Sequence, residues 1–492
     1  MKKRLIRYGF FLILSGCAVG PNYKSPENNV GDTWASESMN ASRDAPKVEW
    51  WEVFEDPLLN KYIGIAAEYN NDVLTATSNI LQARALRQMA ASSFFPQVSA
   101  DVNATKTYFS KNGPIFAIGP STGSVPGTVS AATGLPFAAQ VPQIQSLYNS
   151  LFDVSWEIDL FGKTRRIVEA ASAIIDRSIE ERNDILISVM GELARNYMEL
   201  RTFQKKAQLI EENIALLEEK AELIRKQLEF GYVSRLNDEN IRATLAAERA
   251  MLPDIQARIY QNIYTLSILT GAIPETLISE LLPFQPLPKI PETVAIGLKS
   301  DLLLRRPDIR RAERDLAAAT ANIGVAVASF FPTFTLVGDG GLQSLMLKNL
   351  FSLGSKTWAL GGDVNIPIFQ GGRLMGNLKA KRAETAAKAH SYQQAVLKAL
   401  EETETAIISY TNDLESLKER KEEIDRFKEI VFLSKMRNIK GLISLVDLID
   451  AERQLNEGDQ VLLDSNIKTL LDLISLYKAL GGGWEISLPL DR

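Results

Sequence analysis

The sequence has very little of the side-chain chemistry on which most enzymes depend. Its 492 residues include one cysteine, Cys17, and one histidine, His390. A nucleophile–base pair or a zinc cluster needs more such residues, and no P-loop pattern for nucleotide phosphates occurs. We therefore expect no enzyme activity, no cofactor and no metal site, and we expect His390 to be structural.

Strong net charge and long apolar runs are also missing. The net charge is only −5, which argues against nucleic acid as a partner. After the first residues there is no run of about twenty apolar residues, so we expect no transmembrane helix. The nine methionines are scattered and give no hint of a soft metal. Any crossing of a membrane would have to use strands.

The first residues are typical of a secreted bacterial protein. A basic stretch is followed by the short apolar run 10–14 and by Leu-Ser-Gly-Cys, ending at Cys17. This ending resembles the lipoprotein cleavage box, which implies that residues 1–16 are a signal peptide and that Cys17 is acylated. Ala18 then fits sorting to the outer membrane. An ordinary signal peptide with a chance cysteine is the alternative. We expect residues 17–60 to form a lipidated, extended arm.

The rest of the chain carries the same pattern twice. Ser-Phe-Phe-Pro occurs at 93–96 and again at 329–332, each time after an alanine-rich helical stretch. Four prolines between 283 and 291 separate the copies. We therefore predict a first repeat over 61–275, a linker over 276–300, a second repeat over 301–484 and a tail over 485–492.

Each repeat contains two segments in which apolar and polar residues alternate. They predict strands at about 97–109 and 150–161, joined by a long loop, and at about 333–343 and 356–369. The polar face is acidic, with Asp101, Asp153, Glu157, Asp159, Asp339 and Asp363. Four strands cannot close a barrel, and lipid does not tolerate an open sheet edge. If these strands span a membrane, several chains must share one barrel; a soluble β-sandwich is the alternative.

Very long helices follow the strands. Apolar residues at three–four spacing run from about 165 to 230 and from about 374 to 437. Each helix would be roughly 100 Å long, several times the bilayer core, so it must project away from the membrane. Glycines at 231 and 441 end these helices, and returning helices are predicted at 236–269 and 444–480. The result is two helical hairpins with glycine tips.

These features together resemble the TolC-type outer-membrane efflux channels, in the lipoprotein (NodT-like) branch that serves resistance-nodulation-division pumps. The resemblance covers nearly all of the chain after the signal peptide. The segments that carry it are Cys-Ala-Val-Gly-Pro-Asn-Tyr at 17–23, Trp-Trp at 50–51 with Asp-Pro at 56–57, Arg-Arg-Pro-Asp-Ile-Arg-Arg-Ala-Glu at 305–313, Phe369 with Gly-Gly-Arg at 371–373, and Leu-Tyr-Lys-Ala-Leu-Gly-Gly-Gly-Trp at 476–484.

The resemblance implies a mixed α and β homotrimer. Three chains of four strands would form a twelve-stranded barrel in the outer membrane, continued into the periplasm by a tunnel of helices. The implied function is the passive export of drugs or other small molecules. The implied partners are a periplasmic adaptor, an inner-membrane resistance-nodulation-division pump and outer-membrane lipid. Alternatives are an exit duct for type I protein secretion or for metal ions, or a lipid-anchored coiled-coil scaffold without a pore.

The resemblance also implies where function lies. The hairpin tips, with Gly231, Ser234, Gly441 and Ser444, would dock the adaptor, although each glycine is also explained as a helix-ending turn. Asp447 and Asp450 would form an acidic ring at the narrow end of the tunnel that favours cations. An ordinary solvated acidic face is the alternative.

The sequence departs from the best-known family pattern at both tips. Asn237 stands where aspartate is frequent, and Asn438 and Ile443 replace residues that link the closed gate elsewhere in the family. We therefore hypothesise that an apolar constriction formed by Leu442, Ile443 and Leu445 closes the channel.

Overall fold

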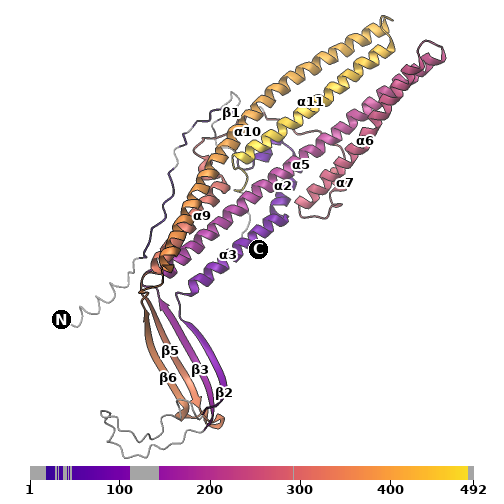
Figure 1. Ribbon diagram of the computed structural model, residues 1–492. Coiled ribbons are helices and arrows are strands. Elements are labelled where there is room, and N and C mark those ends of the chain that lie inside the picture. Colours follow the sequence, from indigo (N-terminus) through magenta and orange to yellow (C-terminus); the bar gives the residue numbers. More distant parts are fainter. Residues whose placement is uncertain are drawn as a thin grey trace, which may run out of the picture. The chain divides into compact units, whose positions relative to one another are not determined.

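A computed structural model describes residues 18–27, 30–31, 33–36, 41–42, 44, 47–110, 143–291 and 293–485 (Figure 1). Cys17 and most of the predicted long loop lie outside these ranges. The chain divides into two compact units. The sheet unit contains residues 1–22, 86–170 and 320–382, and the helical unit contains residues 23–85, 171–319 and 383–492. No helix within the described ranges has the length and apolar character needed to span a bilayer.

The sheet unit is built on four antiparallel strands in the order β2-β3-β5-β6. Their bounds are β2 Gln97–Tyr108, β3 Ile144–Ile158, β5 Thr333–Ser344 and β6 Lys356–Asn365. The central β3–β5 pair joins the two repeats, and Figure 1 shows the strands as one sheet. Within the described residues the outer edges of β2 and β6 have no strand partner.

The register gives the sheet one apolar and one acidic face, as the alternation predicts. Asp153 lies opposite Asp339, while the neighbouring Phe152 lies opposite Gly340 and belongs to the other face. Trp358 of β6 is also opposite Gly340 and stands on that apolar face, where 79% of its surface is exposed. A sheet with one broad exposed apolar face is what a lipid-facing wall requires.

Three strand ends differ from the sequence-based expectation. β3 ends at Ile158 rather than near 161, so Asp159, predicted on the acidic face, lies after the strand and accepts from the amides of Thr164 and Arg165. β3 begins at Ile144 rather than near 150, because Ile144 to Asn149 pair with β2 from Tyr108 to Asn103. The polar residues Gln145 and Ser146 hide this extension in the sequence. β6 ends at Asn365 rather than near 369. Pro367 follows that end, and a proline has no N–H with which to continue a strand ladder.

The remaining elements are mostly helical. The short ones are β1 Ala41–Ser42, η1 Trp50–Phe54, α7 Ile278–Leu281, β4 Val294–Ala295, α8 Leu302–Arg305, η2 Leu347–Asn349 and η3 Leu353–Ser355, with β1 and β4 pairing in parallel. The longer helices are α2 Pro57–Tyr69, α3 Asn71–Ser92, α5 Lys163–Glu229, α6 Arg235–Leu269, α9 Pro307–Ala328, α10 Arg373–Ile439 and α11 Leu445–Ala479.

Corresponding elements of the two repeats have equal lengths. Helices α5 and α10 each contain 67 residues, and their returning partners α6 and α11 each contain 35. The helices before the sheet, α3 and α9, each contain 22 residues. Pro253 lies inside α6 without dividing it into two helices. The duplicated sequence therefore builds a duplicated structure.

The core of the helical unit is apolar and lies among the long helices. Fully buried aromatic residues such as Trp50, Tyr62 and Tyr197 pack there with leucines and isoleucines of α5, α6, α10 and α11. η1 and the start of α2 at Pro57 lie inside the stretch 17–60, which the sequence predicts to be extended. The side chain of Asp56 accepts from the amides of Leu58 and Leu59 and caps this helix start.

Two of the motifs that carry the family resemblance, at 305–313 and at 476–484, meet at one junction in the helical unit. The Arg306 guanidinium donates to both carboxylate oxygens of Asp308, at 2.9 and 2.7 Å, to Glu402 at 2.7 Å and to the carbonyl of Ala479 at 3.1 Å. Trp484 donates its indole N–H to the carbonyl of Arg305. This junction fastens the end of α11 to the segment before α9, so these motif residues have a structural role.

The arm after the predicted lipidation site is held at the foot of the sheet. In the sheet unit, the amide of Val19 donates to the carbonyl of Phe161 at 3.1 Å, just after β3. Arg166 donates to the carbonyls of Val19 and Gly20 and to the side chain of Asn22. In the helical unit, the arm continues with Tyr23, whose hydroxyl donates to Glu313 at 2.9 Å.

Candidate functional site at the hairpin turns

Both predicted tips are tight glycine turns between long helices. At the first, the amide of Gly231 donates to the carbonyl of Leu228 at 2.9 Å, and that of Tyr232 to the carbonyl of Gln227 at 2.8 Å. At the second, Gly441 donates to Asn438 at 2.8 Å and Leu442 to Arg437 at 2.9 Å.

This double hydrogen bond is the Schellman motif, in which the glycine adopts a left-handed conformation. The φ angles are +77° for Gly231 and +67° for Gly441. A Cβ atom on either glycine would meet nothing within 4 Å, so backbone conformation rather than crowding explains the need for glycine. The turn interpretation is therefore sufficient for both glycines, and it is compatible with docking.

The second tip continues into a fully formed helix cap. The Ser444 hydroxyl accepts from the amide of Asp447 at 3.2 Å, and the Asp447 carboxylate accepts from the amide of Ser444 at 2.9 Å. This reciprocal arrangement is a capping box, which satisfies two backbone amides that the helix leaves unpaired. Asp447 is exposed, and its hydrogen bonds from Ser444 hold its pKa below the ordinary value.

The first tip has the same outline but a weaker cap. Its sequence Gly-Tyr-Val-Ser-Arg-Leu-Asn matches Gly-Leu-Ile-Ser-Leu-Val-Asp of the second tip position by position. Here the Ser234 hydroxyl donates to the side-chain oxygen of Asn237 at 2.9 Å, and no backbone amide of α6 donates to the Ser234 side chain. Asn237 therefore lacks the negative charge that Asp447 places at the start of α11.

Large apolar side chains are exposed around both turns. Phe230 and Tyr232 flank Gly231, with 75% and 80% of their surfaces exposed and their ring centroids 6.3 Å apart. At the second tip Ile439 and Leu442 are also exposed. Exposed aromatic and aliphatic residues in a group are typical of surfaces that bind another protein.

The two acidic residues predicted to form a ring already have partners within the chain. Asp447 is engaged by Ser444, and Asp450 forms an ion pair with Lys220 of α5. The Asp450–Lys220 pair links the two hairpins near their tips. Sequence reasoning missed this pair, because a lysine some 230 positions away gives no local signal. The acidic ring stays a prediction.

The residues of the predicted apolar constriction follow Gly441 directly. Leu442 and Leu445 are exposed and Ile443 is half-buried. Asn438 donates its amide to the carbonyl of Ile443 at 3.2 Å, so it ties the tip to the end of α10. The constriction itself is a property of an assembly and stays a prediction. In the described part of the chain no group of three or more His, Cys, Asp or Glu side chains is placed to hold a metal.

Comparison with known proteins identifies the architecture. The family model described as outer membrane efflux protein matches residues 62–272 and 298–482, one segment for each repeat. The antibiotic efflux pump outer membrane protein ArpC of Pseudomonas putida is 30% identical over 480 residues, covering 96% of this chain and 94% of ArpC. The toluene efflux pump outer membrane protein TtgF, also of Pseudomonas putida, is 29% identical over 498 residues, covering 99% of this chain and 98% of TtgF.

A solved structure has the same fold. The outer-membrane channel OprN superposes with a TM-score of 0.82 at 28% sequence identity, covering 95% of this chain and all of the OprN chain. The agreement extends over both the strands and the hairpins because almost the whole of each chain is included.

Proposed function

This chain belongs to the outer membrane efflux protein family, and from that membership we propose that three copies of it form the exit channel of a tripartite pump. The family is a channel family rather than an enzyme class. Efflux across the outer membrane is thus the function of the chain. The trimer, the pump partners and the cargo are the proposed parts.

The open sheet carries the proposal of a trimer. Within the described residues the outer edges of β2 and β6 have no strand partner, and unpaired backbone groups are not tolerated in lipid. Joining β6 of one copy to β2 of the next satisfies both edges. Three copies would give twelve strands, which lies within the range of closed outer-membrane barrels. The acidic face would then line the pore, and the face with Phe152 and Trp358 would meet lipid.

The anchor at Cys17 is proposed from the arm. Ala18 packs so closely against Gly162 that a Cβ on this glycine would lie 2.6 Å from the Ala18 Cα. Gly162 has φ +80° and follows the membrane-facing strand β3 by four residues. An acylated Cys17 would therefore enter the bilayer next to the foot of the sheet. Cys17→Ser should abolish labelling with a palmitate analogue while leaving the folding of the sheet intact.

We propose two protein partners, of which the adaptor binds the hairpin tips. A periplasmic adaptor would contact Gly231, Ser234, Gly441 and Ser444 together with the exposed side chains beside them. An inner-membrane resistance-nodulation-division pump would supply substrate and energy. The relatives named for antibiotic and toluene efflux favour small, largely apolar cargo. Protein secretion and metal-ion efflux remain alternative cargoes, and a scaffold without a pore is disfavoured by family membership.

The proposal can be tested by measuring how susceptible a strain that lacks this chain is to drugs and to metal salts. A strain without this chain should become sensitive to several unrelated apolar compounds, and the wild-type chain should restore resistance. Tyr232→Asp, which places charge on the exposed tip, should restore less resistance at equal amounts of assembled trimer. Sensitivity to metal salts alone would reassign the cargo. Purified protein that forms no conducting trimer in planar bilayers would overturn the channel assembly.

A further inference from the structure

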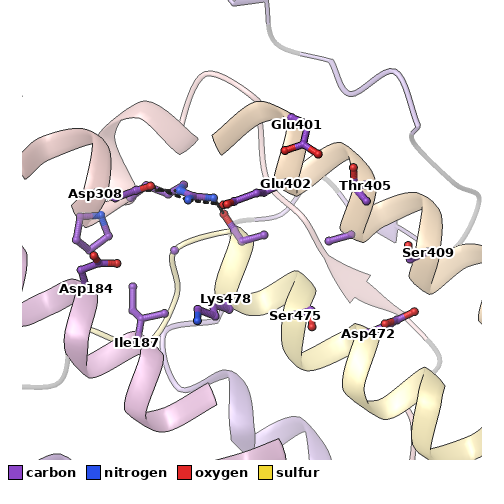
Figure 2. Close-up of a pocket in the computed structure, with 15 residues that line it drawn as sticks. Asp184, Ile187, Asp308, Glu401, Glu402, Thr405, Ser409, Asp472, Ser475 and Lys478 are labelled. Atoms are coloured by element: carbon purple, nitrogen blue, oxygen red, sulfur yellow. Dashed lines mark hydrogen bonds and ion pairs between the residues drawn. The ribbon is translucent and has the colours of Figure 1, made fainter. Parts of the chain in front are cut away.

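A polar cavity lies within the helical unit, where α5, α10 and α11 meet the segment before α9 (Figure 2). Its volume is about 430 Å³. The charged side chains that line it are Asp184, Arg306, Asp308, Glu401, Glu402, Asp472 and Lys478. Arg306 is already paired with Asp308 and Glu402. Asp472 of α11 and Ser409 of α10 also line the cavity, and Figure 2 shows Asp472 away from this pair.

Asp413 of α10 is a buried carboxylate beside Asp472. Only 7% of its surface is exposed. One carboxylate oxygen, Oδ1, accepts from the Lys468 ammonium at 2.7 Å. The other, Oδ2, is fully buried and has no hydrogen-bond donor. A buried acceptor without a donor costs free energy, so this atom needs an explanation.

A candidate donor for Oδ2 of Asp413 lies on the facing helix α11. Lys468 of α11 contacts Asp413, and Asp472 follows one turn later on the same face of that helix. Asp413 is also the neighbour whose hydrogen bonding and charge act on the Asp472 carboxyl. Two ionised carboxylates only accept, so the bond forms only when one of them carries a proton. Lys468, one turn before Asp472 on α11, donates to Oδ1 and leaves Oδ2 without a donor.

We propose that Asp413 and Asp472 form a proton-binding site that fastens α11 to α10 in acidic medium and loosens in neutral medium. The proton comes from solvent, because Asp472 is only partly buried and lines the cavity, and it lies on the Asp472 carboxyl, from which it is donated to Asp413. The charged groups that face the pair are Lys468 on its own helix, and, along the cavity, Lys478 of α11, Glu401 and Glu402 of α10 and Asp184 of α5.

The surroundings of Asp472 favour its uptake of a proton in mildly acidic medium. Burial, followed by the hydrogen bond and the charge of Asp413, raises the pKa of Asp472 to about 6, against a smaller opposing effect of Lys468. The pKa of Asp472 is raised above its ordinary value of 3.8, so protonated Asp472 stabilises the folded chain. This stabilisation is fully present below pH 3.8 and is lost as the pH rises through about 6. Asp413 and Asp472 belong to the same chain, so the proposed proton-binding site does not depend on the proposed cargo or partners.

The test compares thermal unfolding midpoints of the full-length protein in detergent between pH 4.5 and 8. The wild type should lose stability as the pH rises through about 6. Asp472→Asn supplies an amide donor at every pH, so its midpoint should lack this step and should exceed the wild type only in neutral medium. Asp464→Asn is the matched control, because Asp464 is an exposed carboxylate of the same helix, paired with Lys206. Its profile should follow the wild type.

Two further measurements keep the test decisive if Asp472→Asn fails to fold. Asp413→Asn should also remove the step, because its amide can donate to an ionised Asp472. In the wild type, backbone amides around Asp472 should exchange with deuterium more slowly at pH 5 than at pH 7.5 after correction for the chemical rate. A pH-independent difference between wild type and both variants, or equal corrected exchange at the two pH values, would overturn the proposal.

Discussion

Ser444 and Asp447 cap the start of α11 reciprocally, each accepting a hydrogen bond from the backbone amide of the other. In the first repeat, the Ser234 hydroxyl donates to the side chain of Asn237, and the Asn237 amide donates to the Ser234 carbonyl rather than to its hydroxyl. The two turns share their glycine and serine but differ in the residue that faces the serine, Asn237 or Asp447. The two tips are therefore expected to respond differently to loss of the serine hydroxyl.

Removal of the serine hydroxyl should expose this difference. Ser444→Ala removes a cap, which costs about 1 kcal/mol in typical helices. Ser234→Ala should cost clearly less, because no backbone amide of α6 depends on that side chain. The measurement is deuterium exchange of the first turns of α11 and α6 in the two variants. Equal loss of protection in both turns would contradict the assignment of the caps.

The cap of α11 should also resist acid. Hydrogen bonds from the Ser444 hydroxyl and then from its backbone amide lower the pKa of Asp447 below 3.8. A lowered pKa means that the stabilisation is present above the ordinary value and disappears only as the pH falls below it. Protection of the first turn of α11 should therefore be unchanged from pH 7 to pH 4.5. In Asp447→Asn the same turn should be less protected, with no further change on acidification.

Two glycines with similar φ angles should differ in their tolerance of a side chain. Gly441→Ala should cost about 1 kcal/mol, the strain of a left-handed residue, because its Cβ would meet open space. Gly481→Ala should cost more, since its Cβ would lie 3.0 Å from Arg306 Cγ and 3.2 Å from Arg306 Cα. Unfolding midpoints in one detergent give the comparison. A smaller loss for Gly481→Ala would show that the junction around Arg306 can shift.

The buried guanidinium of Arg306 should not be replaceable by an ammonium. Arg306→Lys keeps the charge but loses the fork that binds Asp308 through two nitrogens. The expected loss is about 2 kcal/mol, in the range for hydrogen bonds between charged groups. Arg311→Lys is the control, because Arg311 is partly exposed and makes one ion pair at 3.3 Å to Asp184. A similar loss in both variants would indicate a general effect of arginine replacement.

A polar substitution should change the conductance of the channel at the second tip, where the apolar constriction is proposed, and not at the first. Ile443→Ser should raise single-channel conductance in planar bilayers, because a polar side chain weakens an apolar closure. Val233 occupies the matching position at the first tip, and Val233→Ser should leave conductance nearly unchanged. Unchanged conductance in Ile443→Ser would lead us to abandon the apolar constriction.

The long elements of the fold were predictable because their signals are periodic. Three–four spacing placed α5 and α10 to within a few residues. Alternation placed the two faces of the sheet on the correct residues except Asp159, which lies after the end of β3. The start of β3 was not predictable. Residues such as Gln145 and Ser146 look like loop, and only their pairing with β2 makes them strand.

The contacts of the candidate site were much less predictable than its position. The glycines and serines of the tips follow from local turn chemistry. The Asp450–Lys220 pair and the buried state of Asp413 depend on which helix faces which, and a charged residue in a helical repeat looks like an ordinary solvated position. Sequence periodicity gives the face of a helix, but not its neighbour.

The equal helix lengths of the two repeats restrict the insertions and deletions that the long helices can accept. A deletion of one heptad from α10 would shorten the second arm by about 10 Å and leave the first unchanged. The tips would then end at different depths, and a flat partner could engage only one of them. Viable insertions and deletions should therefore occur as matched pairs, one in each half of the gene.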